Sequence, residues 1–113
     1  IGHELKNYLS LLEWFLQQNG AVSGYPKTFY SGLTAVEVAD VVCEYILSNF
    51  RHGLFHLAGN SISKFELLSK IKKRYGLNHI EIYPDLDVIL NRTMDCEKFQ
   101  DVYNCKDNDQ YCK

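Results

Sequence analysis

Apolar side chains recur at helical spacing in three segments of the chain. From residue 5 to residue 16 they fall three or four positions apart, which predicts an amphipathic helix over Lys6–Gln18 that ends at Asn19-Gly20. A second helix is expected over Thr34–Phe50, where apolar residues occupy more than one side, so it should be the most buried helix. A third helix is expected over Ser63–Tyr75, with its lysines, Lys64 included, pointing outward. Its inward stripe would consist of Leu67, Leu68, Ile71 and Tyr75.

Capping signals mark where the second and third helices begin. Thr34 stands three residues before Glu37, and Ser63 stands three residues before Glu66. In such a capping box the hydroxyl and the carboxylate each accept a hydrogen bond from a backbone N–H group that the helix start leaves without a partner. Gly76 follows the third helix and is expected to end it.

Two segments carry the pattern of strands. Ile80–Tyr83 alternates apolar and polar residues, which predicts a strand. A short apolar run bounded by glycines predicts a buried strand over Leu54–Ala58, with His56 as a hydrogen-bonded core residue rather than a metal ligand. The connection Ala21–Tyr30 is rich in turn residues and has room for small strands. The predicted fold class is therefore α/β, with three main helices and short strands.

Composition narrows the classes of function. The 113 residues and the hydrophobic share of 46% fit one folded domain, and a net charge of −2 argues against a nucleic-acid partner. No apolar run approaches the ~20 residues that a membrane-spanning helix requires. No basic segment followed by an apolar core opens the chain, so no secretory signal is recognised. We therefore expect a cytoplasmic protein with neither nucleic acid nor a membrane as its partner.

The four cysteines do not have the spacing of a metal site. They form no Cys-x-x-Cys pair, and no histidine follows Cys96, so a zinc site is not expected. Cys43 lies in an apolar stretch and should be a small buried hydrophobic residue. A disulfide between Cys105 and Cys112 is conceivable, but free thiols in a reducing compartment are favoured. Residues 101–113 are expected to form a polar, frayed tail after a lobe of residues 1–100.

The chain lacks the motifs of nicotinamide chemistry. Its seven glycines form neither a Gly-x-Gly-x-x-Gly fingerprint nor a P-loop. None of its eight tyrosines is followed four positions later by lysine. We therefore expect no catalytic, cofactor-binding or metal site in this chain by itself.

A set of short motifs resembles a known family. In order, they are Ile1–Leu5, Leu12–Leu16, Phe29–Thr34, Gly53–Leu57, Ile62–Leu68 and Asn91–Asp95 followed by Phe99. Together they are similar to the C-terminal part of the dTDP-4-dehydrorhamnose reductase-like branch of extended short-chain dehydrogenases/reductases, in the NAD-dependent epimerase/dehydratase superfamily. Arg92, within Asn-Arg-Thr-Met-Asp, is the closest to a family signature. The residues after Phe99 depart from the family pattern.

The resemblance implies a two-part oxidoreductase of which this chain is one part. An N-terminal Rossmann domain would hold NAD(P), and a Tyr-x-x-x-Lys pair would drive hydride and proton transfer. The C-terminal lobe would cover a nucleoside diphosphate sugar, which is the ligand expected here. The chain would thus be the substrate-binding lobe without its Rossmann domain, not catalytic alone and with no cofactor of its own. Reduction, epimerisation and dehydration share this lobe, so the reaction subtype stays open.

Four side chains are candidates for contact with that ligand. The diphosphate calls for cations, and Arg92 is the first candidate because its guanidinium can hold phosphate oxygens in a bidentate way. Lys27 is the second, since the resemblance places a phosphate-facing basic residue in that turn. Tyr30 and Trp14 could stack on a base or a sugar. In the alternative interpretation both cations are solvated surface charges and Trp14 simply packs against a helical stripe.

Two further functions compete with the substrate lobe. The first is a stand-alone, non-catalytic interaction or regulatory domain derived from the same lobe, which would dock through the apolar face that a missing Rossmann domain leaves. The same exposed face predicts self-association of the chain. The second is a small helical adaptor with an accidental resemblance, for which all three helical stripes should be uniformly buried.

Overall fold

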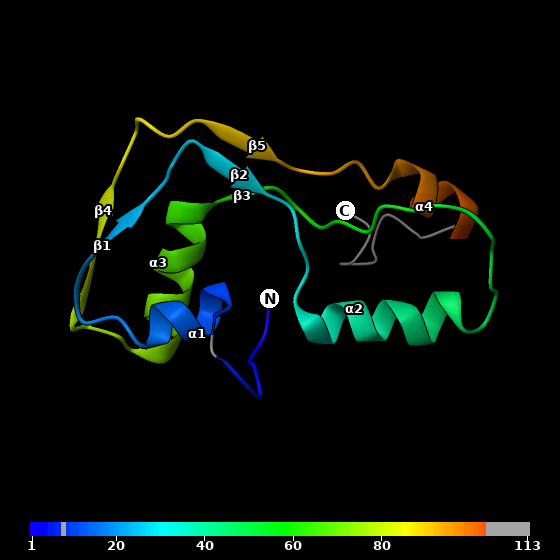
Figure 1. Ribbon diagram of the computed structural model, residues 1–113. Coiled ribbons are helices and arrows are strands. Elements are labelled where there is room, and N and C mark those ends of the chain that lie inside the picture. The colour runs from blue at the N-terminus through cyan, green and yellow to red at the C-terminus, as the bar shows by residue number, and fades with distance from the viewer. Residues whose placement is uncertain (8, 104–113) are drawn as a thin grey trace. The chain divides into compact units, whose positions relative to one another are not determined.

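The computed structural model describes residues 1–7 and 9–103 (Figure 1). It confirms a mixed α/β fold of short elements. In chain order these are α1 (Leu11–Leu16), β1 (Gly20–Gly24), β2 (Thr28–Tyr30), α2 (Ala35–Val41), the π-helical turn η1 (Val42–Ile46), β3 (Ile62–Ser63), α3 (Lys64–Tyr75), β4 (Ile80–Pro84), β5 (Leu90–Arg92) and α4 (Glu97–Tyr103). They form two compact units: unit 1 contains residues 1–30 and 62–92, and unit 2 contains residues 31–61 and those from Thr93 onward.

Unit 1 holds the five strands of the described residues, in two small sheets. β1 pairs in parallel with β4, which confirms the strand predicted over Ile80–Tyr83. In the second sheet β2 lies between β3, which is antiparallel to it, and β5, which is parallel to it. β1 and β2 are the small strands that the sequence allowed in the turn-rich connection Ala21–Tyr30. The sequence pattern did not predict β3 or β5.

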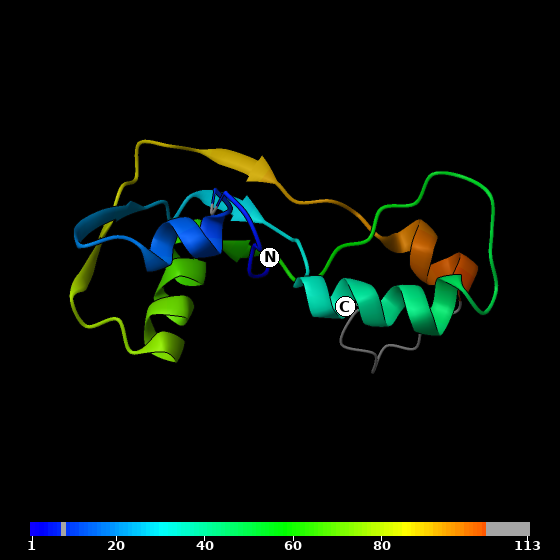
Figure 2. The ribbon, with the colours of Figure 1, turned by 60° about the horizontal axis from the view of Figure 1, so that its bottom comes forward.

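α1 and α3 lie side by side in unit 1 and share its core (Figures 1 and 2). The buried side chains of that core are Leu12, Phe15, Val22, Leu68, Ile71 and Ile80. Outside the core, the His3 ring joins the two helices: its Nδ1 lies 2.6 Å from the Glu13 carboxylate and its Nε2 lies 3.0 Å from the Tyr75 hydroxyl. Tyr75 is 45% exposed, so its predicted place in the inward stripe of α3 is wrong.

The helix predicted over Lys6–Gln18 ends within two residues of its predicted end but begins later than predicted. α1 covers six residues, because the segment before it is held in another conformation. The Leu9 N–H donates to the Glu4 carboxylate at 2.6 Å, and Asn7 has a φ of 69°, which a right-handed helix does not allow. Leu5 is 97% exposed, so the extra turn would have buried little apolar surface.

α3 begins and ends where its sequence signals predict, but only the serine half of its predicted capping box is formed, and the Glu66 carboxylate pairs with Lys70 instead. The Ser63 hydroxyl accepts a hydrogen bond from the Glu66 N–H at 3.1 Å. At the other end Gly76 adopts the left-handed conformation (φ 64°), and the Leu77 N–H donates to the Lys72 carbonyl at 3.0 Å. This helix therefore presents its first residue, Lys64, at a fixed position directly after β3.

In unit 2 the capping box of α2 is confirmed, but the burial of its helix is not. The Thr34 hydroxyl accepts from the Glu37 N–H at 3.2 Å, and the Glu37 carboxylate accepts from the Thr34 N–H at 2.7 Å. Across α2 and η1, however, Val41 is the buried residue, while Val36 is 71% exposed. Among the described residues of unit 2, α4 and the segment near residue 55 cover one stripe of this helix, so its other apolar sides face solvent. The prediction of the most buried helix is wrong.

The core of unit 2 is built around an aromatic cluster. Val41 and Phe99 are buried, and Figure 2 shows α4 beside α2 in this unit. Tyr45, Phe55 and Tyr103 place their rings against Phe99. The expected frayed tail is wrong for residues 101–103, which lie in α4.

Three further predictions for unit 2 are wrong. Leu54–Ala58 forms no strand, because no strand in the described residues pairs with it, and His56 is exposed. Cys43 is exposed because it follows the buried Val41 by two positions and so lies on the other side of the helix. Cys105 and Cys112 lie outside the described residues. No helix in the described part of the chain is long and apolar enough to span a bilayer.

Candidate functional site

A pocket of about 270 Å³ in unit 1 contains two of the four candidate residues. Its walls come from β2, β5, the start of α3 and the segment around α1. The lining residues are Ile1, Leu11, Thr28, Phe29, Tyr30, Lys64, Leu67 and Arg92. The pocket thus combines apolar and aromatic walls with two cations, and the residues that line it include no acidic side chain. Such a surface suits an anionic ligand that also carries an apolar ring.

Sheet pairing brings the two candidates together. In the parallel pairing of β2 with β5, Tyr30 is the register partner of Arg92, although 62 positions separate them in the chain. On the other side of β2, Phe29 is the register partner of Ser63, so the next residue, Lys64, enters the same pocket. Three of the motifs behind the family resemblance are therefore neighbours in one three-stranded sheet.

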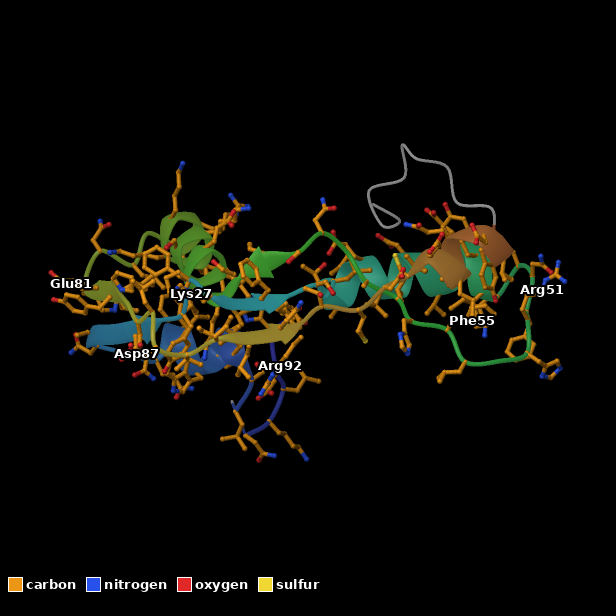
Figure 3. The ribbon with its side chains drawn as sticks, turned by 90° about the horizontal axis from the view of Figure 1, so that it is seen from above. Lys27, Arg51, Phe55, Glu81, Asp87 and Arg92 are labelled. Carbon is orange, nitrogen blue, oxygen red and sulfur yellow. The ribbon has the colours of Figure 1, made fainter. Side chains whose placement is uncertain are left out.

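The Arg92 guanidinium is exposed and makes no ion pair with any described residue. Neither the His3–Glu13 contact nor the Glu66–Lys70 ion pair involves Arg92. Figure 3 shows Arg92 on β5, at the end of the strand. Its guanidinium is planar and carries five N–H donors, a geometry that matches two oxygens of one phosphate or carboxylate. A ligand oxyanion is therefore a suitable partner for Arg92.

Lys27 and Trp14 do not line this pocket. Lys27 lies just before β2 with an exposed side chain, and its carbonyl accepts a hydrogen bond from the Leu90 N–H at 3.2 Å (Figure 3). Trp14 is 37% exposed and lines a separate pocket of about 250 Å³ in unit 1, which Lys64 and Tyr25 also line. The structure thus brings together Tyr30 and Arg92 but places Lys27 and Trp14 elsewhere in the unit.

Sequence reasoning missed Lys64, which lines the pocket beside Arg92. Helical periodicity assigned it to the outward face of α3, and it is half-buried instead. The signal that could have found it is its position directly after the capping residue Ser63. A residue at the first helical position is surrounded by whatever precedes the helix, here β3 and its partner β2, as well as by its own helix.

One pKa in unit 1 departs clearly from its usual value, and it lies outside the pocket. The Tyr83 hydroxyl donates a hydrogen bond to the Glu81 carboxylate at 2.5 Å, which raises the pKa of Tyr83, and the negative charge of Glu81 raises it further. This hydrogen bond stabilises the fold below the ordinary tyrosine pKa. Its contribution is lost as pH rises through the pKa of folded Tyr83.

Replacing Glu81 by glutamine should therefore lower the pKa of Tyr83. Both the charge and the carboxylate acceptor are removed, so the phenol loses the partner that holds its proton. The measurement is an absorbance titration of tyrosinate at alkaline pH, with Tyr83→Phe identifying which step belongs to this residue. An unchanged titration in the Glu81→Gln protein would show that the hydrogen bond does not control this ionisation.

No cluster of three or more His, Cys, Asp or Glu side chains in the described residues is placed to hold a metal ion. Comparison with models of protein families, with curated proteins and with solved structures finds no match to this chain. The site therefore has to be interpreted from its own residues and from the motifs that contribute to it.

Proposed function

We propose that this chain binds a nucleoside diphosphate sugar, as the substrate-binding part of an NAD(P)-dependent sugar-nucleotide reductase of the dTDP-4-dehydrorhamnose reductase-like type. The observation that carries the proposal is the pocket in which Arg92, without an ion-pair partner in the described residues, lies beside Tyr30. Both residues come from motifs on which the family resemblance rests. Neighbouring β-strands place those motifs together, so they can act on one ligand.

Each part of the pocket has a task in this proposal. The Arg92 guanidinium would hold the diphosphate by donating two parallel N–H···O bonds to its oxygens. Tyr30 and the apolar wall formed by Leu11 and Leu67 would lie against the base or the sugar, where they exclude water. The chain would bind and orient its ligand, while a nicotinamide held by another domain would supply the hydride.

The exposure of α2 and η1 bears on both candidate functions. The pattern of apolar residues predicts burial there, and the apolar side chains of Val36, Val38 and Leu47 are exposed instead. In the proposed reductase a cofactor-binding domain would cover them. The same side chains also favour the second candidate, a non-catalytic interaction domain that docks through this helix. The two candidates differ in whether the chain needs a sugar nucleotide.

Arg92→Ala should weaken the binding of sugar nucleotides by roughly tenfold to a hundredfold. A charge-assisted hydrogen bond contributes roughly 1.5–3 kcal/mol, and each 1.4 kcal/mol is about tenfold in affinity. The measurement is calorimetric titration of the chain with dTDP-, UDP- and GDP-sugars. Arg92→Lys should recover part of the loss, because lysine keeps the charge but not the planar fork.

A matched control is Arg74→Ala, which removes the same side chain from an exposed position on α3 and should leave affinity unchanged. If Arg92→Ala lowers the melting temperature but not the affinity, Arg92 has a structural role and the proposed site is wrong. If the unaltered chain binds none of the sugar nucleotides yet self-associates in light scattering, the interaction domain replaces the proposed function.

A further inference from the structure

One edge of β1 is open. The sheet that contains β1 consists of β1 and β4, so the side of β1 that faces away from β4 pairs with no described strand (Figure 1). On the other side, the Gly20 N–H donates to the His79 carbonyl at 3.3 Å. In a parallel pair, alternate residues bond to the partner strand. The backbone groups of Ala21 and Ser23, which alternate with those that face β4, therefore point to the open edge.

The open edge of β1 lacks the features that normally protect a sheet edge. Natural edge strands carry charged side chains, proline or bulges that keep other chains away. β1 (Gly20–Gly24) contains neither a charge nor a proline, and its exposed side chains at Ala21 and Ser23 are small. β4, by contrast, contains Glu81 and ends at Pro84. Another strand can therefore approach the backbone of β1 closely.

The pocket of about 250 Å³ lies along this open edge. Three consecutive residues of β1, positions 21–23, line it together with Trp14, Tyr25 and Lys64. Successive side chains of a strand point to opposite faces, so a pocket that meets three residues in a row meets the edge of the strand. The residues that line this pocket include no Asp or Glu.

Two aromatic rings hold the ammonium group of Lys64 in this pocket. Its Nζ lies 5.7 Å from the ring centroid of Trp14 and 5.0 Å from that of Tyr25, and at these distances the ring faces attract the cation. Lys64 makes no ion pair with any described residue. Aromatic faces do not use its three N–H donors as a carboxylate would. The pocket therefore presents a positioned cation beside unpaired backbone groups.

We propose that the open edge of β1 is a docking site for an extended, acidic peptide segment of a partner protein. The segment adds a strand to the sheet, and its backbone exchanges hydrogen bonds with Ala21 and Ser23. One glutamate side chain of the segment enters the pocket, where its carboxylate accepts from the Lys64 ammonium. In this mode of recognition main-chain bonds supply affinity and side-chain pockets supply specificity. Trp14 and Tyr25 are positioning residues, because they hold Lys64 in place before the segment arrives.

The charge in the pocket favours this occupant over a second copy of the chain. Pairing of two β1 strands edge to edge would satisfy their backbone groups, but β1 contains no acidic residue to meet Lys64. A free anion would meet Lys64 but leave the backbone of Ala21 and Ser23 unpaired. An extended segment that carries a glutamate satisfies both the edge and the cation.

The test is a titration of the chain with the blocked peptide acetyl-Val-Thr-Glu-Thr-Val-amide. Trp14 is the single tryptophan of the chain and lines the pocket, so its emission should change saturably as the peptide binds. Calorimetry measures the same affinity independently. The peptide with glutamine in place of glutamate should bind about tenfold more weakly, because its contact with Lys64 has lost one of two charges.

Variants of the chain test the same contact from the other side. Lys64→Met removes the charge and keeps an unbranched stem to pack between the rings, so the fold should persist. It should weaken binding of the glutamate peptide about tenfold and of the glutamine peptide much less, since both changes remove one contact. Lys73→Met makes the same change at an exposed position on α3 outside this pocket and should leave both affinities unchanged.

Methylated peptides test the strand edge without altering the chain. In an extended peptide, alternate N–H groups point to opposite edges. One peptide is therefore methylated on the nitrogens of both threonines, and the other on the nitrogens of glutamate and the last valine. One pattern blocks the peptide edge that faces β1 and should abolish binding. The other leaves that edge free and should retain most of the affinity.

Three results would contradict this docking site. The first is the absence of saturable binding of the glutamate peptide in both measurements. The second is equal binding of the two methylated peptides, which would mean that no peptide edge pairs with β1. The third is an equal effect of Lys64→Met on the glutamate and glutamine peptides, which would mean that Lys64 does not read the carboxylate.

Discussion

Replacing Phe99 by alanine is expected to destabilise unit 2 by about 3–5 kcal/mol, the usual cost of deleting a buried aromatic ring. Phe99 is 1% exposed, and its ring centroid lies 4.7 Å from that of Tyr103 and 6.2 Å from that of Tyr45. The buried cluster of this unit contains Phe99 and Val41, with partly buried neighbours around them. A cavity at Phe99 would therefore remove most of the contacts that hold α4 against α2.

The measurement for Phe99→Ala is amide hydrogen exchange, which should accelerate across α2, η1 and α4. Val102→Ala is the matched control on the same helix, because Val102 is 38% exposed and its loss should change exchange little. If the two variants exchange alike, Phe99 does not anchor this unit and the aromatic cluster is not its core.

Local signals account for the elements that could be predicted from the sequence. α3 combines a capping serine, two inward leucine or isoleucine positions and a terminal glycine, all within fourteen residues. β4 alternates in polarity and ends at Pro84. In each case the information that specifies the element lies within the element, so no distant partner has to be known.

Non-local contacts decided the elements that could not be predicted. β3 has two residues and β5 has three, too few for any periodicity, and both exist because β2 lies between them. α1, by contrast, starts late because of a local contact, in which the Glu4 carboxylate accepts a hydrogen bond from the Leu9 N–H. α4 carried a usable signal that was overlooked: Phe99 and Tyr103 are four residues apart, and their rings stack.

The candidate site shows the same difference between what local sequence signals predict and what non-local contacts determine. Residue type together with the motifs of the family resemblance selected Arg92 and Tyr30, since a guanidinium suits phosphate and a phenol suits a ring. That they share a pocket depends on the register of β2 with β5, which no local pattern contains. Lys64 could not be selected by periodicity, because its surroundings come from α1 and from the turn after β1.

Leu68→Ala should destabilise unit 1 by about 2–5 kcal/mol, the range for a buried leucine that leaves a cavity. Leu68 is fully buried on α3, in a core shared with Leu12 and Phe15 of α1. Unfolding in denaturant can be followed by the emission of Trp14, the single tryptophan of the chain, which lies on α1. The midpoint should fall markedly in Leu68→Ala and stay unchanged in Leu5→Ala, because Leu5 is 97% exposed.

Leu68 does not line the pocket that contains Arg92, so the Leu68→Ala and Arg92→Ala variants should have different effects. Leu68→Ala should lower stability and leave sugar-nucleotide affinity nearly unchanged under conditions where the protein stays folded. Arg92→Ala should lower that affinity and leave the denaturation midpoint nearly unchanged, because Arg92 is exposed. If Leu68→Ala weakens binding in the folded protein as strongly as Arg92→Ala does, the pocket depends on core packing for its shape, and the loss in Arg92→Ala does not by itself identify a ligand contact.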